Sequence, residues 1–251
     1  MPSNDTIRTQ LNHRTIRAFT ADPVAPEVID TLLEVVAAAA TSSFYQQRTV
    51  IRVVDPGIRQ AVYEASGQPY VGGDRGELLI FVVDLYRNAR IREEAGVEVR
   101  VLESTALFLQ GVEDTLIAAQ NLVVAAESLG LGAVYLGSIG GDSKLLIEAL
   151  KLPLRTFPLV GVLVGHPAQQ PALKPRLPRE ITVAIDTYPL LENVHESLAD
   201  YDQVVKTYYD LRDPAKPVGT FTRQIETKPG GGRAEQAPVR EVLDAQRLAL
   251  Y

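Results

Sequence analysis

Cysteine and tryptophan are absent from this chain of 251 residues, and histidine occurs three times. Without cysteine the protein has no disulfide, no thiolate nucleophile, no iron–sulfur cluster and no zinc-ribbon site. The histidines, His13, His166 and His195, lie far apart, and none has the spacing of a helical metal-binding motif. The sequence therefore predicts no metal site, and nothing in it favours a Ser-His-Asp triad.

An excess of positive charge and a long apolar segment are also missing. Aspartate and glutamate (31) outnumber lysine and arginine (25), and the net charge of −6 argues against a general nucleic-acid binder. The most apolar stretches are too short to span a bilayer or are broken by polar residues such as Gln120 and Glu127. The polar N-terminus lacks the apolar region of a secretory signal. We therefore expect a cytoplasmic enzyme or binding protein with no membrane or nucleic-acid partner.

The first distinctive segment is His13-Arg14-Thr15-Ile16-Arg17. Three side chains that can be cationic and one hydroxyl fall within five residues, a mixture suited to the phosphate of a ligand. A short basic segment is also typical of a solvated surface. A second basic segment is Lys174-Pro175-Arg176, where prolines hold the backbone extended and fix the direction of both cations. Both segments are candidate anion-binding elements.

The hydrophobic pattern predicts helices and strands around a buried core. The helix expected at 105–129 is apolar over most of its circumference, so it is either buried centrally or packed against a partner chain. The charged stretch 87–103 is expected to be an exposed, partly helical excursion. Strands are expected at 49–54, 78–83, 133–136, 157–164 and 181–185, and further helices at 26–40, 56–66, 143–150, 196–210 and 238–249.

Two loops have compositions that allow two interpretations each. Loop 41–47, Thr-Ser-Ser-Phe-Tyr-Gln-Gln, is either a connector or a source of neutral donors and acceptors for a heteroaromatic ring. Loop 137–142, Gly-Ser-Ile-Gly-Gly-Asp, is either a simple turn or a place where backbone N–H groups approach a flat ligand. The sequence contains neither a dinucleotide-binding fingerprint nor a P-loop.

Together these segments resemble the nitroreductase superfamily, and within it the oxygen-insensitive NADPH nitroreductase and NADPH–flavin oxidoreductase group. The resemblance covers about residues 6–210 and is weakest after Asp213. Dispersed motifs that recur in the same order are more specific than any one of them alone. The motifs are, in order, residues 13–20, 41–46, 67–68, 125–137 and 173–178.

The resemblance implies an α+β fold, with a central, mainly antiparallel sheet flanked by helices, and an obligate homodimer that binds FMN at the subunit interface. It also implies that the chemistry belongs to N5 of FMN and that no protein side chain is catalytic. Ser42, Ser43, Phe44 and Gln46 are expected to act from the interface, across it. By motif match, the FMN-binding residues are His13, Arg14, Thr15, Arg17, Ser42, Ser43, Phe44, Gln46, Gln68, Tyr135, Gly137, Ser138, Lys174 and Arg176.

The implied activity is that of an NAD(P)H oxidoreductase that prefers NADPH, with NADH as the alternative donor. It reduces nitroaromatics, quinones or similar acceptors by two electrons in a ping-pong hydride mechanism. Arg212 is the first candidate for binding the 2′-phosphate of NADPH, ahead of Arg223, Lys228 and Arg233. Two alternatives stay open: a flavin reductase that supplies reduced FMN, and a non-catalytic flavin-binding or sensing protein.

The sequence also suggests a division into two parts. Residues 1–212 are predicted to form the FMN-binding core. Residues 213–251, where the composition shifts to proline, glycine and basic residues, are predicted to form a C-terminal arm. The arm is expected to pack on the core or on the partner subunit.

Overall fold

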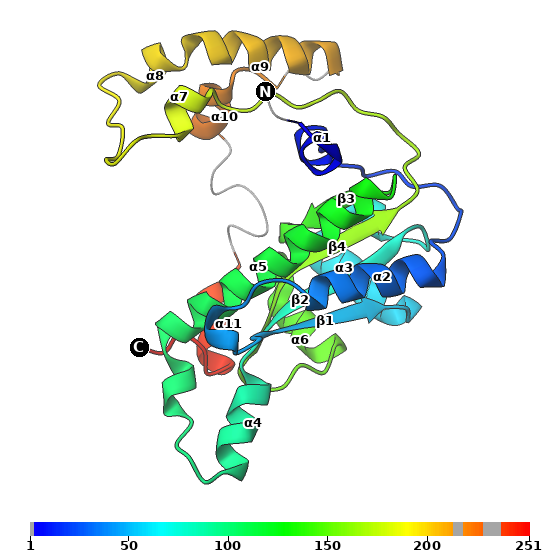
Figure 1. Ribbon diagram of the computed structural model, residues 1–251, viewed down its shortest axis with the longest axis vertical. Helices are drawn as coiled ribbons and strands as arrows, with labels where there is room; N and C mark the ends of the chain where they lie inside the picture. Colours follow the sequence, from blue (N-terminus) through cyan, green and yellow to red (C-terminus); the bar gives the residue numbers. More distant parts are fainter. Residues whose placement is uncertain (1–2, 213–217, 228–236) are drawn as a thin grey trace.

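The computed structural model describes residues 3–212, 218–227 and 237–251, which form an antiparallel sheet flanked by helices (Figure 1). The central strands β2 and β4 are buried along nearly their whole length, as expected for apolar runs covered on both faces. The α+β prediction is therefore confirmed, together with the four strands predicted between residues 49 and 164. The strands are β1 (Arg48–Val53), β2 (Glu77–Asp84), β3 (Gly132–Leu136) and β4 (Thr156–Gly165), in the spatial order β1-β2-β4-β3.

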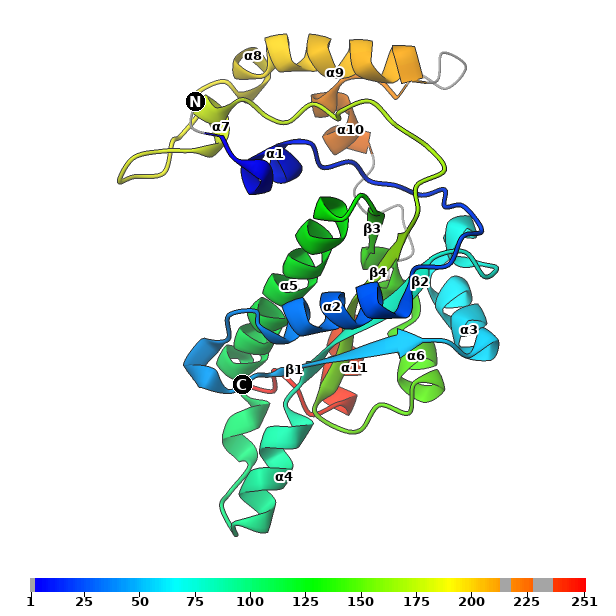
Figure 2. The same cartoon turned by 45° about the vertical axis from the view of Figure 1, so that its right-hand side comes forward.

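One face of the sheet is covered by α2 (Pro26–Ala37) and α5 (Thr105–Ser128), as Figure 2 shows. The apolar residues of α2 recur at three- and four-residue spacing, so that Ile29, Leu32 and Val36 are buried on one side of the helix. The long helix α5 crosses the sheet, and its inner side packs against both α2 and the strands. The predicted helices at 26–40 and 105–129 are confirmed.

The opposite face is covered by α3 (Pro56–Ser66) and α6 (Ser143–Ala149). Asp55 caps the start of α3 by accepting hydrogen bonds from the backbone N–H groups of Gly57 and Ile58. The helix ends at Gly67, whose φ of 63° places it in the left-handed region that glycine tolerates. Asp142 caps α6 through the N–H of Leu145, at 3.0 Å. The sequence predicted these helix ends correctly.

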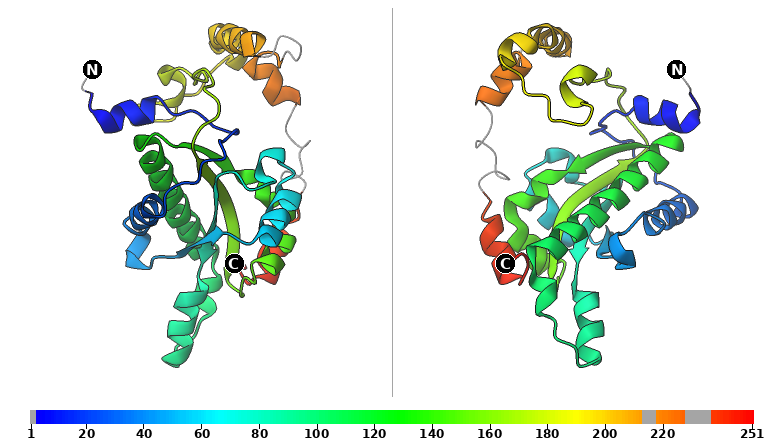
Figure 3. Two further views of the ribbon diagram at one scale, coloured as in Figure 1. Left: turned by 90° about the vertical axis from the view of Figure 1, so that its right-hand side faces the viewer. Right: turned by 60° about the vertical axis from the view of Figure 1, so that its left-hand side comes forward.

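The charged stretch forms a projection beyond one end of the sheet, made of α4 (Tyr86–Glu94) and the 3₁₀ turn η3 (Arg100–Glu103) (Figure 3). The projection is tied to the loop that precedes β1. Arg87 donates to the carbonyl of Gln46 at 3.2 Å, and Asn88 donates to the carbonyl of Tyr45 at 3.3 Å. The expected exposed excursion is therefore present, and it supports loop 41–47.

After β4 the chain leaves the sheet and builds a helical unit that lies beyond α1 (Asp5–Leu11) in all views (Figures 1 and 3). Within it, Tyr201 and Val205 of α9 are buried, and the rings of Tyr201 and Phe221 meet edge to face at 5.4 Å. The helix predicted at 196–210 is confirmed by α9. The unit contains α7 (Arg179–Thr182), α8 (Val194–Ser197), α9 (Ala199–Arg212) and α10 (Phe221–Thr227).

The strand predicted at 181–185 is wrong. Residues up to Thr182 belong to the short helix α7, and the apolar side chains that follow are solvent-exposed, with Val183 at 52% and Ile185 at 86%. The local alternation of apolar residues is compatible with a strand, but a strand needs a partner edge. This segment lies in the helical unit, far from the edge strands β1 and β3 (Figure 1).

The last described segment returns to the core. Its helix α11 (Val239–Ala245) packs beside α6, and Val242 and Leu248 join a buried cluster with Val83 and Phe157. The final helix was predicted at 238–249. The predicted boundary between residues 212 and 213 lies at the edge of the described residues and stays a prediction.

Two ion pairs to the buried carboxylate of Glu103 form a triad that holds the segment after α11 against the core. The carboxylate of Glu103, a residue only 3% exposed, accepts a hydrogen bond from Arg155 at 2.9 Å and forms an ion pair at 2.7 Å with Arg247, whose side chain is 51% exposed. This triad was not predicted, because Glu103 and Arg247 are separated by more than 140 positions in the sequence. The contact joins η3, the turn before β4 and the segment after α11.

Replacing Glu103 with glutamine is expected to lower the free energy of unfolding by about 3 kcal/mol, because two arginines would lose a buried counter-charge. Urea denaturation at fixed protein concentration measures the effect. Asp244→Asn is the matched control, since the pair between Asp244 and Arg240 is solvent-exposed on α11 and is expected to contribute at most about 0.5 kcal/mol. Equal effects of the two substitutions would show that burial gives the triad no special weight.

Candidate functional site

The two basic segments lie far apart in the sequence but line one cavity of about 310 Å³.

 

Residues 13–17 form one wall of this cavity and residues 169–176 form another, although about 150 sequence positions separate them. No aspartate or glutamate is among the lining residues, so the cavity is strongly cationic and suits a dianion. We call it the basic cavity. Its lining residues are His13, Arg14, Thr15, Arg17, Gln169, Gln170, Pro171, Ala172, Lys174, Arg176 and Tyr208.

The first wall is fixed by its docking onto the sheet. The N–H of Ile16 donates to the carbonyl of Ala133 at 2.9 Å, and Thr15 forms a parallel bridge with the same residue of β3. Ile16 is buried against Gly132, where an added Cβ would lie 2.6 Å from a side-chain carbon of Ile16. The contact between Ile16 and Gly132 was not predicted from the sequence, where the glycine at the start of β3 was the one sign of it.

Phe19 forms a second anchor, at the end of β4. Phe19 is 3% exposed, and a Cβ on Gly165 would lie 2.9 Å from its ring. Backbone hydrogen bonds join Thr20 to His166 and Ala168 to Ala18, both at 2.9 Å. The cationic side chains of residues 13–17 are therefore carried by a backbone held at both ends of the segment, which is the opposite of a solvated surface strand.

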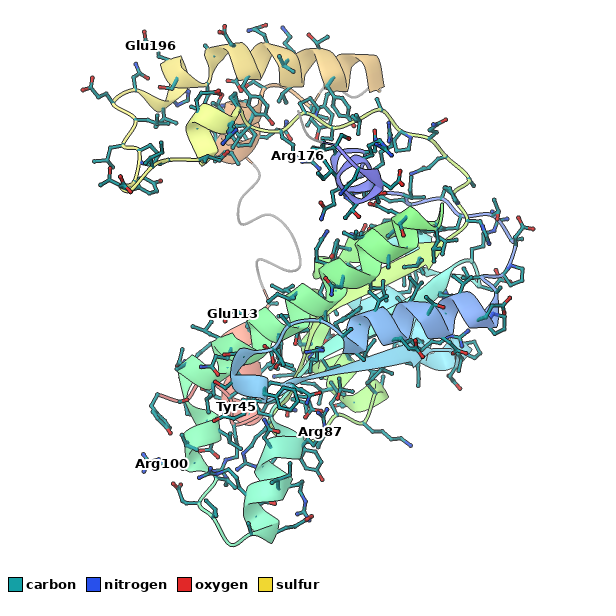
Figure 4. All side chains as sticks on the ribbon, in the orientation of Figure 1. Tyr45, Arg87, Arg100, Glu113, Arg176 and Glu196 are labelled. Atoms are coloured by element: carbon teal, nitrogen blue, oxygen red, sulfur yellow. The ribbon has the colours of Figure 1, made fainter. Side chains whose placement is uncertain are left out.

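The second wall is joined to the first and to α9. The Nε of Arg14 donates to the carbonyl of Pro171 at 2.9 Å. The hydroxyl of Tyr201 donates to the carbonyl of Pro175 at 3.3 Å, and the ammonium of Lys174 lies 5.9 Å from the ring centre of Tyr209. Arg176, labelled in Figure 4, projects from this wall near α1. The helical unit thus holds the second basic segment against the first.

Gln68 lies in a loop beside the basic stretch. The guanidinium of Arg17 stands 5.9 Å from the ring centre of Tyr70, two residues after Gln68. The loop is fixed from below by Arg59, a buried residue whose guanidinium donates to the carbonyls of Val71, Arg75 and Gly76. Burial lowers the pKa of Arg59. Nothing in the sequence distinguished Arg59 from an exposed helix arginine.

The glycine loop is a 3₁₀ turn, η4 (Gly137–Asp142), that packs against α3, the helix that ends just before Gln68. A Cβ placed on Gly137 would meet no protein atom within 4 Å. Ser138 is half-buried beside it. Open space over a glycine backbone is what the close approach of a flat ligand requires.

Tyr135 precedes this loop on β3, and its hydroxyl donates to the side-chain oxygen of Gln120 on α5 at 3.0 Å. Burial, with a further contribution from the carboxylate of Glu127, raises the pKa of Tyr135 to about 12. The phenol therefore stays neutral and keeps its proton at physiological pH. Glu127 also contacts His13, with 2.6 Å between Oε1 and Nδ1.

Loop 41–47 is organised by one buried carboxylate. Asp114 of α5 is 1% exposed and accepts hydrogen bonds from the hydroxyl of Thr41 and from the N–H groups of Ser42 and Gln47. Above this anchor, Ser43, Phe44 and Gln46 have φ values of 52°, 61° and 50°, a left-handed conformation that is costly for side-chain-bearing residues. Phe44 is 81% exposed. The loop therefore holds its polar groups and one aromatic ring in a single, strained conformation.

This loop does not reach the basic cavity of its own chain. Asp114 below the loop and Glu127 beside His13 are thirteen residues apart on α5, which corresponds to about 20 Å along the helix axis. Figure 4 shows the same separation, with Tyr45 and Arg87 near one end of α5 and Arg176 beyond the other. The predicted residues Ser42, Ser43, Phe44 and Gln46 therefore form a second group, separate from the others within one chain.

The remaining candidates concern NADPH. The side chain of Arg212 and the residues Lys228 and Arg233 lie outside the described residues. Arg223 is exposed on α10 and pairs with Glu226 at 2.8 Å. Among the described residues, no group of three or more His, Asp or Glu side chains is arranged to hold a metal ion. No helix in the described part of the chain has the length and apolar character needed to cross a membrane.

Comparison with known proteins agrees with this geometry. Residues 11–166 match the nitroreductase family, and residues 174–251 match the C-terminal domain of the nitroreductase family. An FMN reductase (NADPH) from Bacillus subtilis (strain 168) is 39% identical over 225 residues, which cover 88% of this chain and 90% of that protein.

Solved structures are similar over the whole chain. The NfrA1 nitroreductase from B. subtilis superposes with a TM-score of 0.89 at 35% identity, covering 98% of this chain and 100% of that one. The NADPH:FMN oxidoreductase from Vibrio harveyi, solved in complex with NAD+, gives a TM-score of 0.87 at 34% identity, covering 99% and 100%. The fold of the helical unit after β4 is thus shared with these proteins as well as the sheet.

The open space over Gly137 yields a prediction. Gly137→Ala is expected to leave the free energy of unfolding of the apoprotein within about 1 kcal/mol, because the added methyl meets no protein atom. The same methyl is expected to weaken the binding of a flat ligand at this loop about tenfold, measured with FMN by fluorescence quenching. Gly132→Ala is the contrasting variant: its methyl collides with Ile16, so its main effect is lower stability. Unchanged FMN binding by Gly137→Ala would place the ring elsewhere.

Proposed function

Because this chain belongs to the nitroreductase family, we propose that it is an FMN-dependent NADPH oxidoreductase that reduces nitroaromatics, quinones or similar acceptors by two electrons. The observation that carries the proposal is the basic cavity, in which two distant cationic segments converge without any carboxylate in the lining. Such a site is suited to the terminal phosphate of FMN, which carries nearly two negative charges at neutral pH.

The residues around the cavity fit the rest of FMN. Arg14 and Arg17 with Lys174 and Arg176 supply the positive charge for the phosphate, and the hydroxyl of Thr15 supplies a further hydrogen bond. The neutral donors and acceptors of Gln68, Tyr135, Gly137 and Ser138 suit the polar edge of the isoalloxazine ring. Their assignment as ring contacts is part of the proposal.

The chemistry would come from FMN, which would supply a hydride acceptor for NADPH and a two-electron donor for the final acceptor. The protein residues bind and orient. The arginines and lysine hold the phosphate, the bare backbone at Gly137 leaves the ring room to approach, and Tyr135 stays neutral beside it. In this scheme no side chain is required to act as a nucleophile.

A second cavity supports binding of the nucleotide donor. It has a volume of about 600 Å³ and lies on the other side of the 174–177 segment, so that Lys174 and Arg176 line both cavities. Its remaining walls are mostly aromatic and aliphatic, a composition that suits an adenine ring. The relative from B. subtilis is named for NADPH, and the preference for NADPH over NADH here is proposed by analogy with it. Arg212 stays the candidate for the 2′-phosphate.

We also propose that the protein acts as a homodimer. Leu109, Leu116 and Ile117 of α5 are between 43% and 51% exposed, although α5 is the central helix of the fold. An open cleft of about 1220 Å³ runs between α1 and the second half of α5. A second copy of the chain on this surface would bury the apolar side chains and bring its own loop 41–47 to the flavin. The cytoplasmic location stays a prediction.

A flavin reductase is the second candidate function, and a specific observation favours it. The relative from B. subtilis carries the name FMN reductase (NADPH), and the protein from V. harveyi is described as an NADPH:FMN oxidoreductase. The two candidates differ in whether reduced FMN leaves the protein or stays bound while an acceptor is reduced. The predicted cavity residues are the same for both.

The proposal predicts that the purified protein contains FMN, that NADPH bleaches its flavin absorption within seconds, and that NADH does so more slowly. Stopped-flow absorbance measures both rates. Turnover with free FMN, compared with turnover with a nitrofuran or a quinone, separates the reductase from the nitroreductase. A flavin that binds but is not bleached by either nucleotide would leave only the non-catalytic binding protein.

Arg17 provides a test of the phosphate site. Arg17→Ala is expected to raise the dissociation constant of FMN on the order of 30-fold, since a charge-assisted hydrogen bond to phosphate is worth about 2 kcal/mol. Flavin content after gel filtration and fluorescence titration of the apoprotein measure the loss. Arg52→Ala is the control, because Arg52 lies on β1 and pairs with Glu77 away from the cavity. Full retention of FMN by Arg17→Ala would contradict the assignment.

A further inference from the structure

Glu127 has no role in the proposed function, although it makes the shortest polar contact at the edge of the basic cavity. It lies in the last turn of α5, and its carboxylate contacts His13, which follows α1. The two residues are 114 positions apart in the sequence. The distance between Oε1 of Glu127 and Nδ1 of His13 is 2.6 Å. The side chain of Glu127 is 12% exposed and that of His13 is 30% exposed.

The position of this carboxylate is unfavourable for two reasons. A negative charge in the last turn of a helix opposes the helix dipole, at a cost of about 0.3–1 kcal/mol. A carboxylate beside a phosphate site also repels the ligand that the site attracts, and the lining of the basic cavity otherwise contains no acidic side chain. Both unfavourable effects would be offset if the carboxylate orients His13, which itself lines the cavity.

The contact determines how His13 presents itself. An ionised carboxylate only accepts hydrogen bonds, so Nδ1 of His13 must carry the proton in this pair. The ring is then held in one orientation, and Nε2 is the nitrogen that remains for a ligand in the cavity. A ring that carries protons on both nitrogens can donate to Glu127 through Nδ1 and to a phosphate oxygen through Nε2 at the same time.

Glu127 also lies close to Tyr135 of β3, a candidate contact of the flavin ring. Its charge contributes to the raised pKa of Tyr135, whose hydroxyl donates to Gln120, about two turns before Glu127 on α5. The carboxylate therefore stands between a residue of the phosphate site and a residue of the proposed ring site. Any effect of Glu127 on the phosphate must be separated experimentally from an effect on the ring.

We propose that Glu127 is a positioning residue for the phosphate of FMN, which orients His13 through Nδ1 so that Nε2 donates to the phosphate. The inference rests on the proposed function, since it requires FMN phosphate in the basic cavity. It assigns Glu127 no contact with the cofactor and no part in electron transfer.

The test compares two flavins that differ only in the phosphate. Apoprotein is titrated with FMN and with riboflavin, following flavin fluorescence, for the wild type, Glu127→Gln and Glu127→Ala. Both variants are expected to bind FMN about tenfold more weakly and riboflavin within about twofold of the wild type. Glu148→Gln is the matched control, because Glu148 is an exposed glutamate in the last turn of α6; it is expected to change neither affinity.

A double-mutant cycle with His13 shows whether the effect passes through the imidazole. In the background of His13→Ala, adding Glu127→Ala is expected to cause no further loss of FMN affinity. A loss that persists in that background, an equal loss of riboflavin affinity, or an unchanged FMN affinity would each overturn the inference. If the wild-type apoprotein binds FMN no better than riboflavin, the basic cavity is not a phosphate site and the proposed function itself is at fault.

Discussion

The docking of residues 13–19 onto the sheet is the contact on which the site depends. Ile16 against Gly132 and Phe19 against Gly165 hold this segment at the start of β3 and the end of β4. The backbone bridge between Thr15 and Ala133 completes the attachment. Cations on a free N-terminal segment would lose much conformational entropy on binding an anion. Here that cost is met during folding, so the cationic side chains are already directed into the cavity before a ligand arrives.

The long helix α5 links the two parts of the site that one chain contains. Near one end, Asp114 organises loop 41–47, and at the other end Glu127 meets His13. Both are acidic residues that accept hydrogen bonds from groups predicted to act on, or next to, the cofactor. The length of the helix keeps these two parts about 20 Å apart. A symmetric pair of chains would bring one end of α5 in each copy towards the opposite end in the other, which explains how residues this far apart can serve the same ligand.

Much of the fold followed from local sequence patterns. The periodicity of Ile29, Leu32 and Val36 located α2 correctly, and Gly67 marked the end of α3. The error at 181–185 arose because a short apolar alternation carries no information on whether a sheet edge is within reach. The motifs named the cationic side chains, but their convergence is a tertiary property that spacing alone does not contain.

The supporting residues were the hardest to foresee. Arg59, Asp114 and Glu103 are charged residues in helices or turns, which are usually exposed, and only the structure shows that they are buried and satisfy backbone or arginine groups. Gly132 and Gly165 are visible in the sequence as small residues in strands of otherwise bulky residues. Each stands at one end of its strand, where Ile16 or Phe19 approaches so closely that a Cβ would not fit.

The Glu103 triad has a consequence for how the chain tolerates change in length. Because it secures the segment after α11 beside the turn before β4, the residues between β4 and α11 form a closed loop instead of a free tail. The entropy of closing a loop grows only with the logarithm of its length, and each doubling costs about 0.6 kcal/mol. Insertions within the helical unit should therefore be nearly neutral for stability, whereas residues 166–178, which lead from the sheet to the cavity wall, have a length that is set by the distance they must span.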